Sequence, residues 1–246
     1  MSKTPFSHRC AVVLGASRGI GFAAAAAFAD AGATTYFLSR SGADVRTLRA
    51  RGKKAFSIRV DATNARDLQD VFRRIIKLRG GVDILVNNLA VNQCVPIEKI
   101  SLDDWNLVLA TNLTSLFLSS KLCLPAMKRK RYGKIVNVSS VAARNRSLVS
   151  GVHYVCSKAG VIGFTRQLAF EAAPYGINVN AVCPGQTRTP MLVQSMTKSQ
   201  IRSLEKSIPL RRVATPEEQA KVISFLASEE SRYMSGAVLD VNGGQI

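Results

Sequence analysis

The stretch at residues 10–21, C-A-V-V-L-G-A-S-R-G-I-G, decides the fold of this 246-residue chain. Residues 10–15 form a short apolar run without alternation, which is typical of a strand buried on both faces of a parallel sheet. Its glycines have the spacing G-x-x-x-G-x-G, and the alanine-rich segment at residues 20–31 predicts a helix. Glycines permit a tight turn, and the N–H groups at the helix N-terminus can face a pyrophosphate. The stretch therefore predicts the strand, phosphate-binding turn and helix of a dinucleotide site.

The remainder of the chain alternates predicted strands with predicted helices. Further strands are predicted at residues 34–40, 55–60, 82–88, 133–139, 177–185 and 237–244. Helices are predicted at residues 20–31, 43–52, 65–78, 101–131, around 154–173 and from 215 onward. Residues 186–212 have weak periodicity and are expected to form a mobile segment over the site. The alternation predicts one α/β domain over residues 1–246, a Rossmann-type doubly wound parallel sheet of about seven strands flanked by helices.

Composition places the chain among ordinary globular proteins, with 47% apolar and 20% charged residues. The sequence shows no repeat and no low-complexity linker, which favours one domain. We find no apolar run long enough to span a bilayer and no N-terminal signal segment. The five cysteines are odd in number and lack C-x-x-C spacing, so no structural metal site is expected. These features predict an intracellular, reducing compartment: the cytoplasm, with the mitochondrial matrix as the alternative.

The formal net charge of +18 is the unusual feature of the composition. Residues 40–79 hold twelve lysines and arginines against four acids. A charge of this size attracts acidic partners over a Debye length, which is about 10 Å at 0.1 M salt. A solvated surface accounts for the charge equally well. Nucleic acid, an anionic membrane face and an acidic protein that delivers substrate are the partners that such a charge would fit.

Tyr154 and Lys158 are four residues apart on a predicted helix, and Ser140 lies at the end of the strand before it. Positions i and i+4 lie one turn apart on the same helix face. We expect the lysine ammonium to favour the phenolate and so to lower the pKa of the tyrosine. The serine hydroxyl can hydrogen-bond the same substrate oxygen. Such a set suits a ketone or a secondary alcohol, whose oxygen exchanges a proton while hydride moves at carbon.

The second predicted strand ends at Ser39 and Arg40, where an acid would hold the ribose hydroxyls of NAD. Ser39 is not acidic, and Arg40 together with Arg18 of the glycine loop can clamp a 2′-phosphate. Two surface arginines in an arginine-rich chain are the alternative interpretation. The missing acid favours NADP(H) as the cofactor.

These segments together resemble the short-chain dehydrogenase/reductase family over nearly the whole chain. L-G-A-S-R-G-I-G matches the family's cofactor loop, N-N-L-A matches its N-N-A-G element, and Ser140, Tyr154 and Lys158 match its catalytic triple. The resemblance implies that Asn112 completes a water-linked proton relay with the lysine, that Asp61 lies near the adenine, and that P-G-Q-T-R-T forms the nicotinamide-side turn. It implies no metal, and a cofactor-binding set of Gly15, Ser17, Arg18, Gly19, Ile20, Gly21, Ser39, Arg40, Asp61, Ala62, Asn88, Tyr154, Lys158, Pro184, Gly185, Thr187 and Thr189.

The sequence departs from the family pattern at three places. Leu14 replaces the usual threonine before the first glycine, and Leu89 with Ala90 replaces Ala-Gly. In the family, that threonine hydroxyl fastens the glycine loop to the N-N-A-G strand. We expect this polar link to be absent and the two leucines to pack together instead. The interval from Ser140 to Tyr154 is one residue longer than in many bacterial members, which a loop can absorb.

Within the family, residues 127–140 and 154–165 are most similar to the 3-oxoacyl-[acyl-carrier-protein] reductases of fatty acid synthesis. That likeness implies NADPH-dependent reduction of a carbonyl to a secondary alcohol, an acidic acyl-carrier protein as partner, and a homotetramer or a hetero-oligomer with a related subunit. We expect the basic run at residues 128–131, with Lys134, to dock the carrier near the active-site mouth. Arg131 matches one of the two docking arginines of that group, whereas the second falls on Tyr175.

Two further hypotheses stay open. A small carbonyl compound is the substrate if the chain is a carbonyl, quinone or hydroxysteroid reductase of the same family. A non-catalytic scaffold or nucleic-acid-binding subunit is the hypothesis from a different class. The intact set of Asn112, Ser140, Tyr154 and Lys158 argues against the second, because a scaffold has no need of all four.

Overall fold

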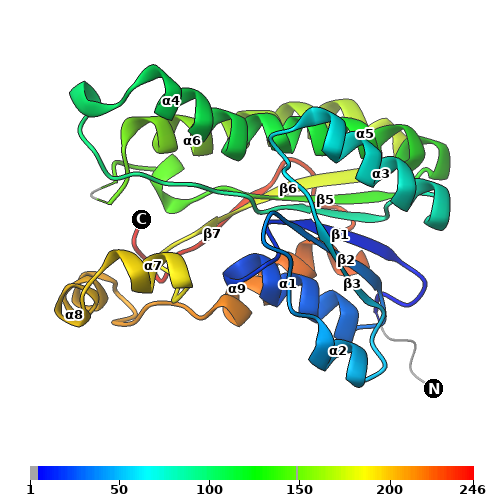
Figure 1. The fold of residues 1–246 in the computed structure, drawn as a ribbon, viewed down its shortest axis with the longest axis horizontal. Coiled ribbons are helices and arrows are strands. Elements are labelled where there is room, and N and C mark those ends of the chain that lie inside the picture. The colour runs from blue at the N-terminus through cyan, green and yellow to red at the C-terminus, as the bar shows by residue number, and fades with distance from the viewer. Residues whose placement is uncertain (1–4, 148) are drawn as a thin grey trace.

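Seven parallel strands form one sheet in the order β3-β2-β1-β4-β5-β6-β7 (Figure 1). The computed structural model describes residues 5–147 and 149–246. The order changes direction between β1 and β4, and such a switch point opens a crevice at the carboxyl ends of the strands. The predicted doubly wound sheet is confirmed, with strands β1 Cys10–Leu14, β2 Thr34–Ser39, β3 Ala55–Arg59, β4 Ile84–Asn87, β5 Gly133–Val138, β6 Ile177–Pro184 and β7 Val238–Val241.

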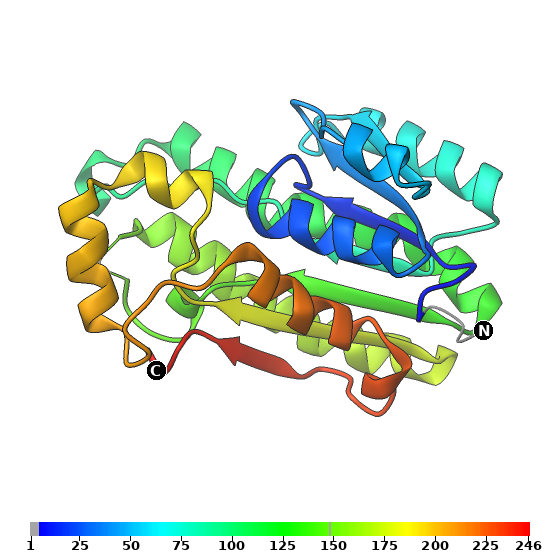
Figure 2. The ribbon, with the colours of Figure 1, turned by 90° about the horizontal axis from the view of Figure 1, so that it is seen from below.

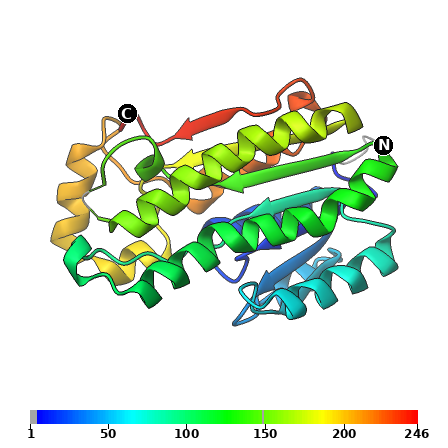
Figure 3. The same cartoon turned by 90° about the horizontal axis from the view of Figure 1, so that it is seen from above.

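Helices cover both faces of this sheet (Figure 2, Figure 3). On one face α1 packs against α9, and on the other α3 packs against α5 beside α6. Two short helices, α7 and α8, lie beyond the carboxyl ends of the strands. The bounds are α1 Gly19–Asp30, α2 Arg46–Ala50, α3 Ala65–Arg79, α4 Leu102–Leu109, α5 Ser115–Lys130, α6 Val152–Ala172, α7 Pro190–Ser195, α8 Lys198–Ser207 and α9 Pro216–Leu226.

Strand β1 shows why the first apolar run of the sequence has no alternation. Ala11 and Val13 belong to the core between the sheet and α1, whereas Val12 and Leu14 belong to the core on the opposite face. Successive side chains of a strand point to opposite faces. Because helices cover both faces, every residue of β1 is buried.

The long helix predicted at residues 101–131 contains an irregular turn. Ser101 begins it, and its Oγ accepts a hydrogen bond from the N–H of Asp104 at 3.0 Å. Between α4 and α5 the chain winds as a π-helix over Ala110–Thr114, with Asn112 inside it. One-turn π-helices are rare and often mark functional sites. In the sequence Asn112 interrupts the apolar face of the predicted helix. In the structure the wider π-helical turn lies at the same position.

By length and composition, one helical run in the described part of the chain, Leu102–Lys130, is long and apolar enough to cross a membrane. The sequence did not predict this, because polar residues divide the run into shorter apolar segments. In this fold Cys123 and Met127 of the run are fully buried against the sheet. Packing against the sheet therefore explains why this helical run is apolar.

Two predicted segments differ from the structure. The basic helix expected at residues 43–52 is shorter, Arg46–Ala50, because Ser57 Oγ accepts the N–H of Ala43 and holds that residue outside the helix. The segment at residues 186–212, where weak periodicity predicted no helix and a mobile segment over the site was expected, contains α7 and α8, and its mobility stays a prediction. The capping box of Thr197 and Gln200 begins α8, and this local signal is present in the sequence.

Candidate active site

A cleft of about 820 Å³ opens at the carboxyl edge of the sheet. The glycine loop, the ends of β2, β4, β5 and β6, and the first turns of α6 form its wall, and α7 borders it. Ser140 lines it, and so do most predicted cofactor-binding residues: Gly15, Ser17, Arg18, Gly19, Ile20, Ser39, Arg40, Asn88, Tyr154, Lys158, Pro184, Gly185, Thr187 and Thr189.

The three residues predicted to act together lie in this one cleft. Ser140 Oγ accepts a hydrogen bond from the N–H of Ala142 at 3.1 Å, and the hydroxyls of Ser140 and Tyr154 line the same cleft. Lys158 is 1% exposed, and its Nζ donates to the carbonyl of Val138 at 2.8 Å. The same Nζ lies 5.9 Å from the centre of the Tyr154 ring. Two hydroxyls and a buried ammonium therefore border the same space.

The pKa values of this cluster follow burial. Burial raises the pKa of Tyr154 above its ordinary value of 10.0, and the hydrogen bond with Ser140 opposes part of the rise. The predicted lowering of this pKa by Lys158 is therefore wrong for this arrangement, in which desolvation of the phenolate is the larger effect. Burial likewise lowers the pKa of Lys158 from 10.5 to about 8. At neutral pH the phenol keeps its proton, and the lysine remains charged.

Two serines that the sequence pattern does not single out hold this cluster in place. Ser139 Oγ donates to the carbonyl of Lys158 at 2.7 Å, which fastens the end of β5 to α6. Ser157 Oγ donates to the carbonyl of Tyr154 at 2.7 Å. The doubled serine at the strand end and the serine beside the lysine were the signals available in the sequence.

Asn112 lies behind the cleft wall and is 2% exposed. Its Oδ1 accepts the N–H of Val91 at 2.8 Å, and its Nδ2 donates to the Val91 carbonyl and to Ser157 Oγ, each at 3.0 Å. The amide thus ties the loop after β4 to α6, one residue from Lys158. The π-helix turns this side chain inward, and a relay from Asn112 to the lysine stays a prediction.

Comparison with known proteins agrees with this geometry. A family model described as "Enoyl-(Acyl carrier protein) reductase" matches residues 15–245. The 3-oxoacyl-[acyl-carrier-protein] reductase FabG of Aquifex aeolicus is 38% identical over 241 residues, which cover 96% of each chain. The FabG of Escherichia coli is 36% identical over 245 residues, 97% of this chain and 98% of that protein. The crystal structure of a 3-oxoacyl-[acyl-carrier protein] reductase from Brucella melitensis superposes with a TM-score of 0.92 at 33% identity, covering 99% of this chain and 94% of that one.

The chain belongs to the short-chain dehydrogenase/reductase family. It is accordingly an oxidoreductase that works with a nicotinamide cofactor. Among residues 5–147 and 149–246, no group of three His, Cys, Asp or Glu side chains is placed to hold a metal ion.

The glycine loop of this dehydrogenase/reductase requires its glycines. Gly15 has a φ of +73°, and a Cβ on Gly21 would lie 2.3 Å from the Gly15 carbonyl oxygen. Leu14 and Leu89 pack in the same apolar core, as expected where the family has threonine. The apolar side chain of Leu14 cannot form the polar link that the family's threonine makes. A different polar link is present, because Asn88 Nδ2 donates to the Gly15 carbonyl at 3.1 Å. Another side chain thus fastens the loop to the end of β4.

Ser39 and Arg40, at the end of β2, are the residues predicted to contact the ribose end of a dinucleotide. Ser39 Oγ is buried and has no hydrogen-bond partner in the described part of the chain. A buried hydroxyl without a partner is costly, so this group is available to a ligand. Arg40 beside it is exposed and lines the cleft. A hydroxyl and a guanidinium therefore stand where the family's NAD-binding members place an acid.

Three predicted cofactor residues lie outside the main cleft. Gly21 is on the far side of the glycine loop, where it packs against Gly15. Asp61 and Ala62 line an adjoining pocket of about 50 Å³ next to Arg40. Hydrogen bonds from Thr63 lower the pKa of Asp61, whose Oδ1 accepts from Thr63 N at 2.9 Å and Oγ1 at 2.7 Å. Because Asp61 is predicted to lie near the adenine of the cofactor, this small pocket is the predicted adenine-binding region.

The basic run at residues 128–131 lies at the opposite edge of the sheet from the cleft. It ends α5 and precedes β5, whereas Ser140 follows β5, so the length of a strand separates them. Lys134 is 2% exposed, and its ammonium donates to Asn178 Oδ1 at 2.8 Å. The prediction that this run lies near the active-site mouth is wrong for a single subunit, because a parallel strand begins and ends at opposite edges.

Proposed function

We propose that this chain is an NADPH-dependent 3-oxoacyl-[acyl-carrier-protein] reductase, a single cofactor-binding domain that reduces the 3-keto group of a carrier-bound acyl thioester to a secondary alcohol. One observation carries the proposal: Ser140, Tyr154 and Lys158 line one cleft together with the glycine loop, and Lys158 Nζ lies 5.9 Å from the centre of the Tyr154 ring. Two hydroxyls can bind one carbonyl oxygen, next to the carbon that accepts hydride. The full-length relatives of that name support the substrate class.

The proposed mechanism assigns a proton step to each residue of the cluster. The nicotinamide cofactor, when bound, supplies the hydride. Tyr154 donates its proton to the carbonyl oxygen as negative charge develops there, because its raised pKa keeps the phenol protonated. Ser140 hydrogen-bonds the same oxygen. Lys158, positive below about pH 8, stabilises the phenolate that is left, and Asn112 is proposed to fix the water that returns the proton.

The same lysine is proposed to hold the nicotinamide ribose through its remaining N–H donors. At the other end of the cleft, Arg18 and Arg40 with the partnerless Ser39 hydroxyl support a 2′-phosphate and thus NADPH. Guanidinium groups match phosphate oxygens in a bidentate fork, and the charged bonds are stronger than neutral ones.

The wall of the cleft away from the glycine loop carries several apolar side chains beside polar ones such as Asn92 and Gln200, and the apolar ones support an acyl chain as substrate. Its side chains come from the turn after Ser140 and from α7 with its flanking residues: Val141, Val149, Met191, Leu192 and Met196. Methionine is unbranched and adapts to irregular apolar shapes. A surface of this kind suits a flexible hydrocarbon chain better than a polar sugar or hydroxy acid.

The experiment follows NADPH oxidation with three substrates of equal chain length. These are a 3-oxoacyl group on acyl-carrier protein, the same group on a small thiol, and a 2-enoyl group on the carrier. We expect both ketones to be reduced, the carrier-bound one with the lower KM, and the enoyl thioester to be inert. Reduction of the enoyl thioester alone, or of none of the three, would refute the proposal.

The proposed assembly is a homotetramer or a hetero-oligomer with a related subunit. Phe117 of α5 and Phe170 of α6 are 44% and 78% exposed, and apolar side chains on outer helix faces are typical of subunit contacts. Light scattering measures the mass directly. We also propose a reducing intracellular compartment, where cysteines as scattered as these stay unpaired.

A further inference from the structure

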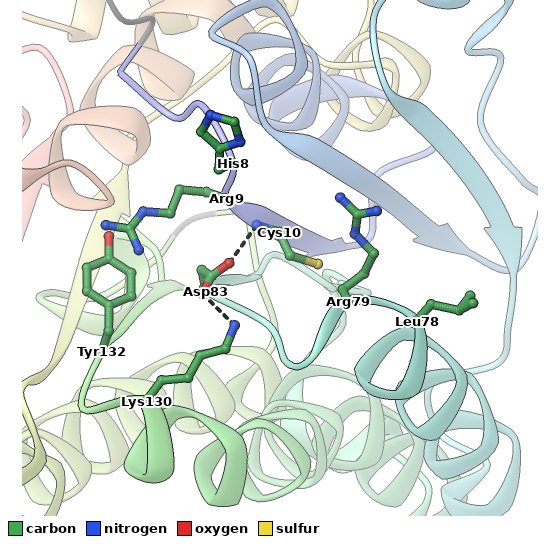
Figure 4. Close-up of a pocket in the computed structure, with 8 residues that line it drawn as sticks. All are labelled: His8, Arg9, Cys10, Leu78, Arg79, Asp83, Lys130 and Tyr132. Atoms are coloured by element: carbon green, nitrogen blue, oxygen red, sulfur yellow. Dashed lines mark hydrogen bonds and ion pairs between the residues drawn. The ribbon is translucent and has the colours of Figure 1, made fainter.

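A second cavity, of about 600 Å³, lies at the amino edge of the sheet, at the opposite end of β1 from the glycine loop (Figure 4). Cys10 at the start of β1 and Asp83 just before β4 form its floor, and the last turns of α3 and α5 reach it through Arg79 and Lys130. The remaining lining residues are His8, Arg9, Leu78 and Tyr132. The proposed reductase chemistry uses none of these residues.

The single carboxylate among the lining residues is fully engaged. Asp83 Oδ2 accepts the N–H of Cys10 at 2.8 Å, and its Oδ1 pairs with Lys130 Nζ at 3.0 Å (Figure 4). Asp83 is 6% exposed, so this pair is largely shielded from water. Its negative charge is therefore neutralised by Lys130, so no lining carboxylate remains to pair with the two arginines of the cavity.

Arg79 has only a neutral partner in the described part of the chain: its guanidinium donates to Thr34 Oγ1 at 2.7 Å. Arg9 stacks over the ring of Tyr132, 3.7 Å from its centre, and its carboxylate partner Glu229 is 3.6 Å away and largely exposed. An exposed pair at that distance is weak. Both guanidinium groups border one cavity and keep most of their hydrogen-bonding capacity.

We propose that this amino-edge cavity binds the phosphate group of a small molecule. Its volume lies within the range of about 300–1,000 Å³ typical of small-ligand sites. The guanidinium fork fits phosphate oxygens in a bidentate manner. Three cations and one carboxylate line the cavity, so its net positive charge favours an anion with more than one charge. The inference does not depend on the proposed function, because the two sites lie at opposite edges of the sheet.

The test is a calorimetric titration with inorganic pyrophosphate at low ionic strength. Arg79→Gln removes the charge and keeps an N–H donor for Thr34. Arg74→Gln is the matched control, since Arg74 is exposed on the same helix and does not line the cavity. Arg18→Gln reports any binding in the cofactor cleft. Acetate at equal ionic strength controls for screening by salt.

We expect saturable binding of pyrophosphate that Arg79→Gln weakens at least tenfold, as loss of a charged hydrogen bond does. Arg74→Gln and Arg18→Gln should leave that binding unchanged, and acetate should not compete. Arg9→Gln is the second variant and should weaken the same binding if Arg79→Gln fails to fold. Binding lost only in Arg18→Gln, equal loss in all variants, or no saturable heat would overturn the proposal.

Discussion

The cleft at the carboxyl edge of the sheet is lined mostly by glycines, hydroxyls and apolar side chains, with one buried lysine and two arginines. The smaller set of residues around the cavity at the amino edge includes two arginines, a lysine and an aspartate. At the carboxyl edge, the backbone positions the proposed ligand-binding groups: Gly15 and Gly21 shape the loop, and the Ser39 hydroxyl has no hydrogen-bond partner among the described residues. At the amino edge, one close ion pair, Asp83 with Lys130, stands beside the charges of Arg9 and Arg79. The same strands thus have one cleft shaped mainly by the backbone and one cavity dominated by side-chain charge, and anion binding at the second should depend more strongly on salt.

The largest effect on activity is expected in the carboxyl-edge cleft, from Tyr154→Phe. The change removes the proton donor and keeps the ring, so fold and cofactor binding should survive. General acid catalysis is worth about 10²- to 10⁴-fold, and carbonyl reduction should fall by that factor. Steady-state kinetics on a 3-oxoacyl thioester measures it, with cofactor affinity as the control. A variant that keeps more than about a tenth of the rate would show that another group gives the proton.

Cofactor choice tests whether charge also acts at the carboxyl edge. Each charged hydrogen bond is worth roughly 1.5–3 kcal/mol, so Arg18 and Arg40 can supply a preference of about a hundredfold for NADPH over NADH. Arg40→Asp should erode or reverse it. The measurement is the ratio of kcat/KM for the two cofactors, and Arg59→Asp, on the neighbouring strand outside the cleft, is the control. If the wild type used NADPH and NADH with equal kcat/KM, Arg18 and Arg40 would not recognise the 2′-phosphate.

The pH profile distinguishes the two titrating groups of the cluster. Lys158, with a pKa of about 8, is charged below that pH and neutral above it, whereas the pKa of Tyr154 is raised above 10. We expect kcat/KM for reduction to fall above about pH 8, by roughly tenfold one pH unit higher. Lys158→Arg keeps the charge at every accessible pH and should move this limb upward. An unmoved limb would assign it to another group.

The smallest effect is expected from the basic run at the amino edge. Because that run lies far from the cleft of its own subunit, it can dock a carrier only if a second copy brings its run to the cleft of the first. Replacing Arg129 and Arg131 with Glu should then raise the KM for a carrier-bound ketone several-fold at low salt, and less at high salt. The rate with a small free ketone should not change. If both substrates respond alike, the run serves only to cap α5.

Local sequence patterns determined the fold and the main parts of the site. Buried strands alternate with helices, and each pattern is readable within about a dozen residues, because burial on both faces forces an apolar run and a helix needs its cap. The spacing of Tyr154 and Lys158 fixes their common helix face, and Gly15 and Gly21 fix the loop. Seven strands and the cleft lined by the predicted serine, tyrosine and lysine follow from these patterns.

Only the tertiary structure decided how these parts act on one another. The pKa of Tyr154 rises because elements distant in sequence bury it, and this desolvation outweighs the opposing effect of the Ser140 hydroxyl. Asn112 turns inward through a π-helix and bonds Val91, and Ser39 is left without a partner in the described part of the chain. The basic run after α5 lies at the amino edge because β5 separates it from Ser140. The burial of a side chain, its hydrogen-bond partners and the edge of the sheet at which it lies all depend on contacts between segments that are remote in sequence. A single segment of sequence does not contain that information.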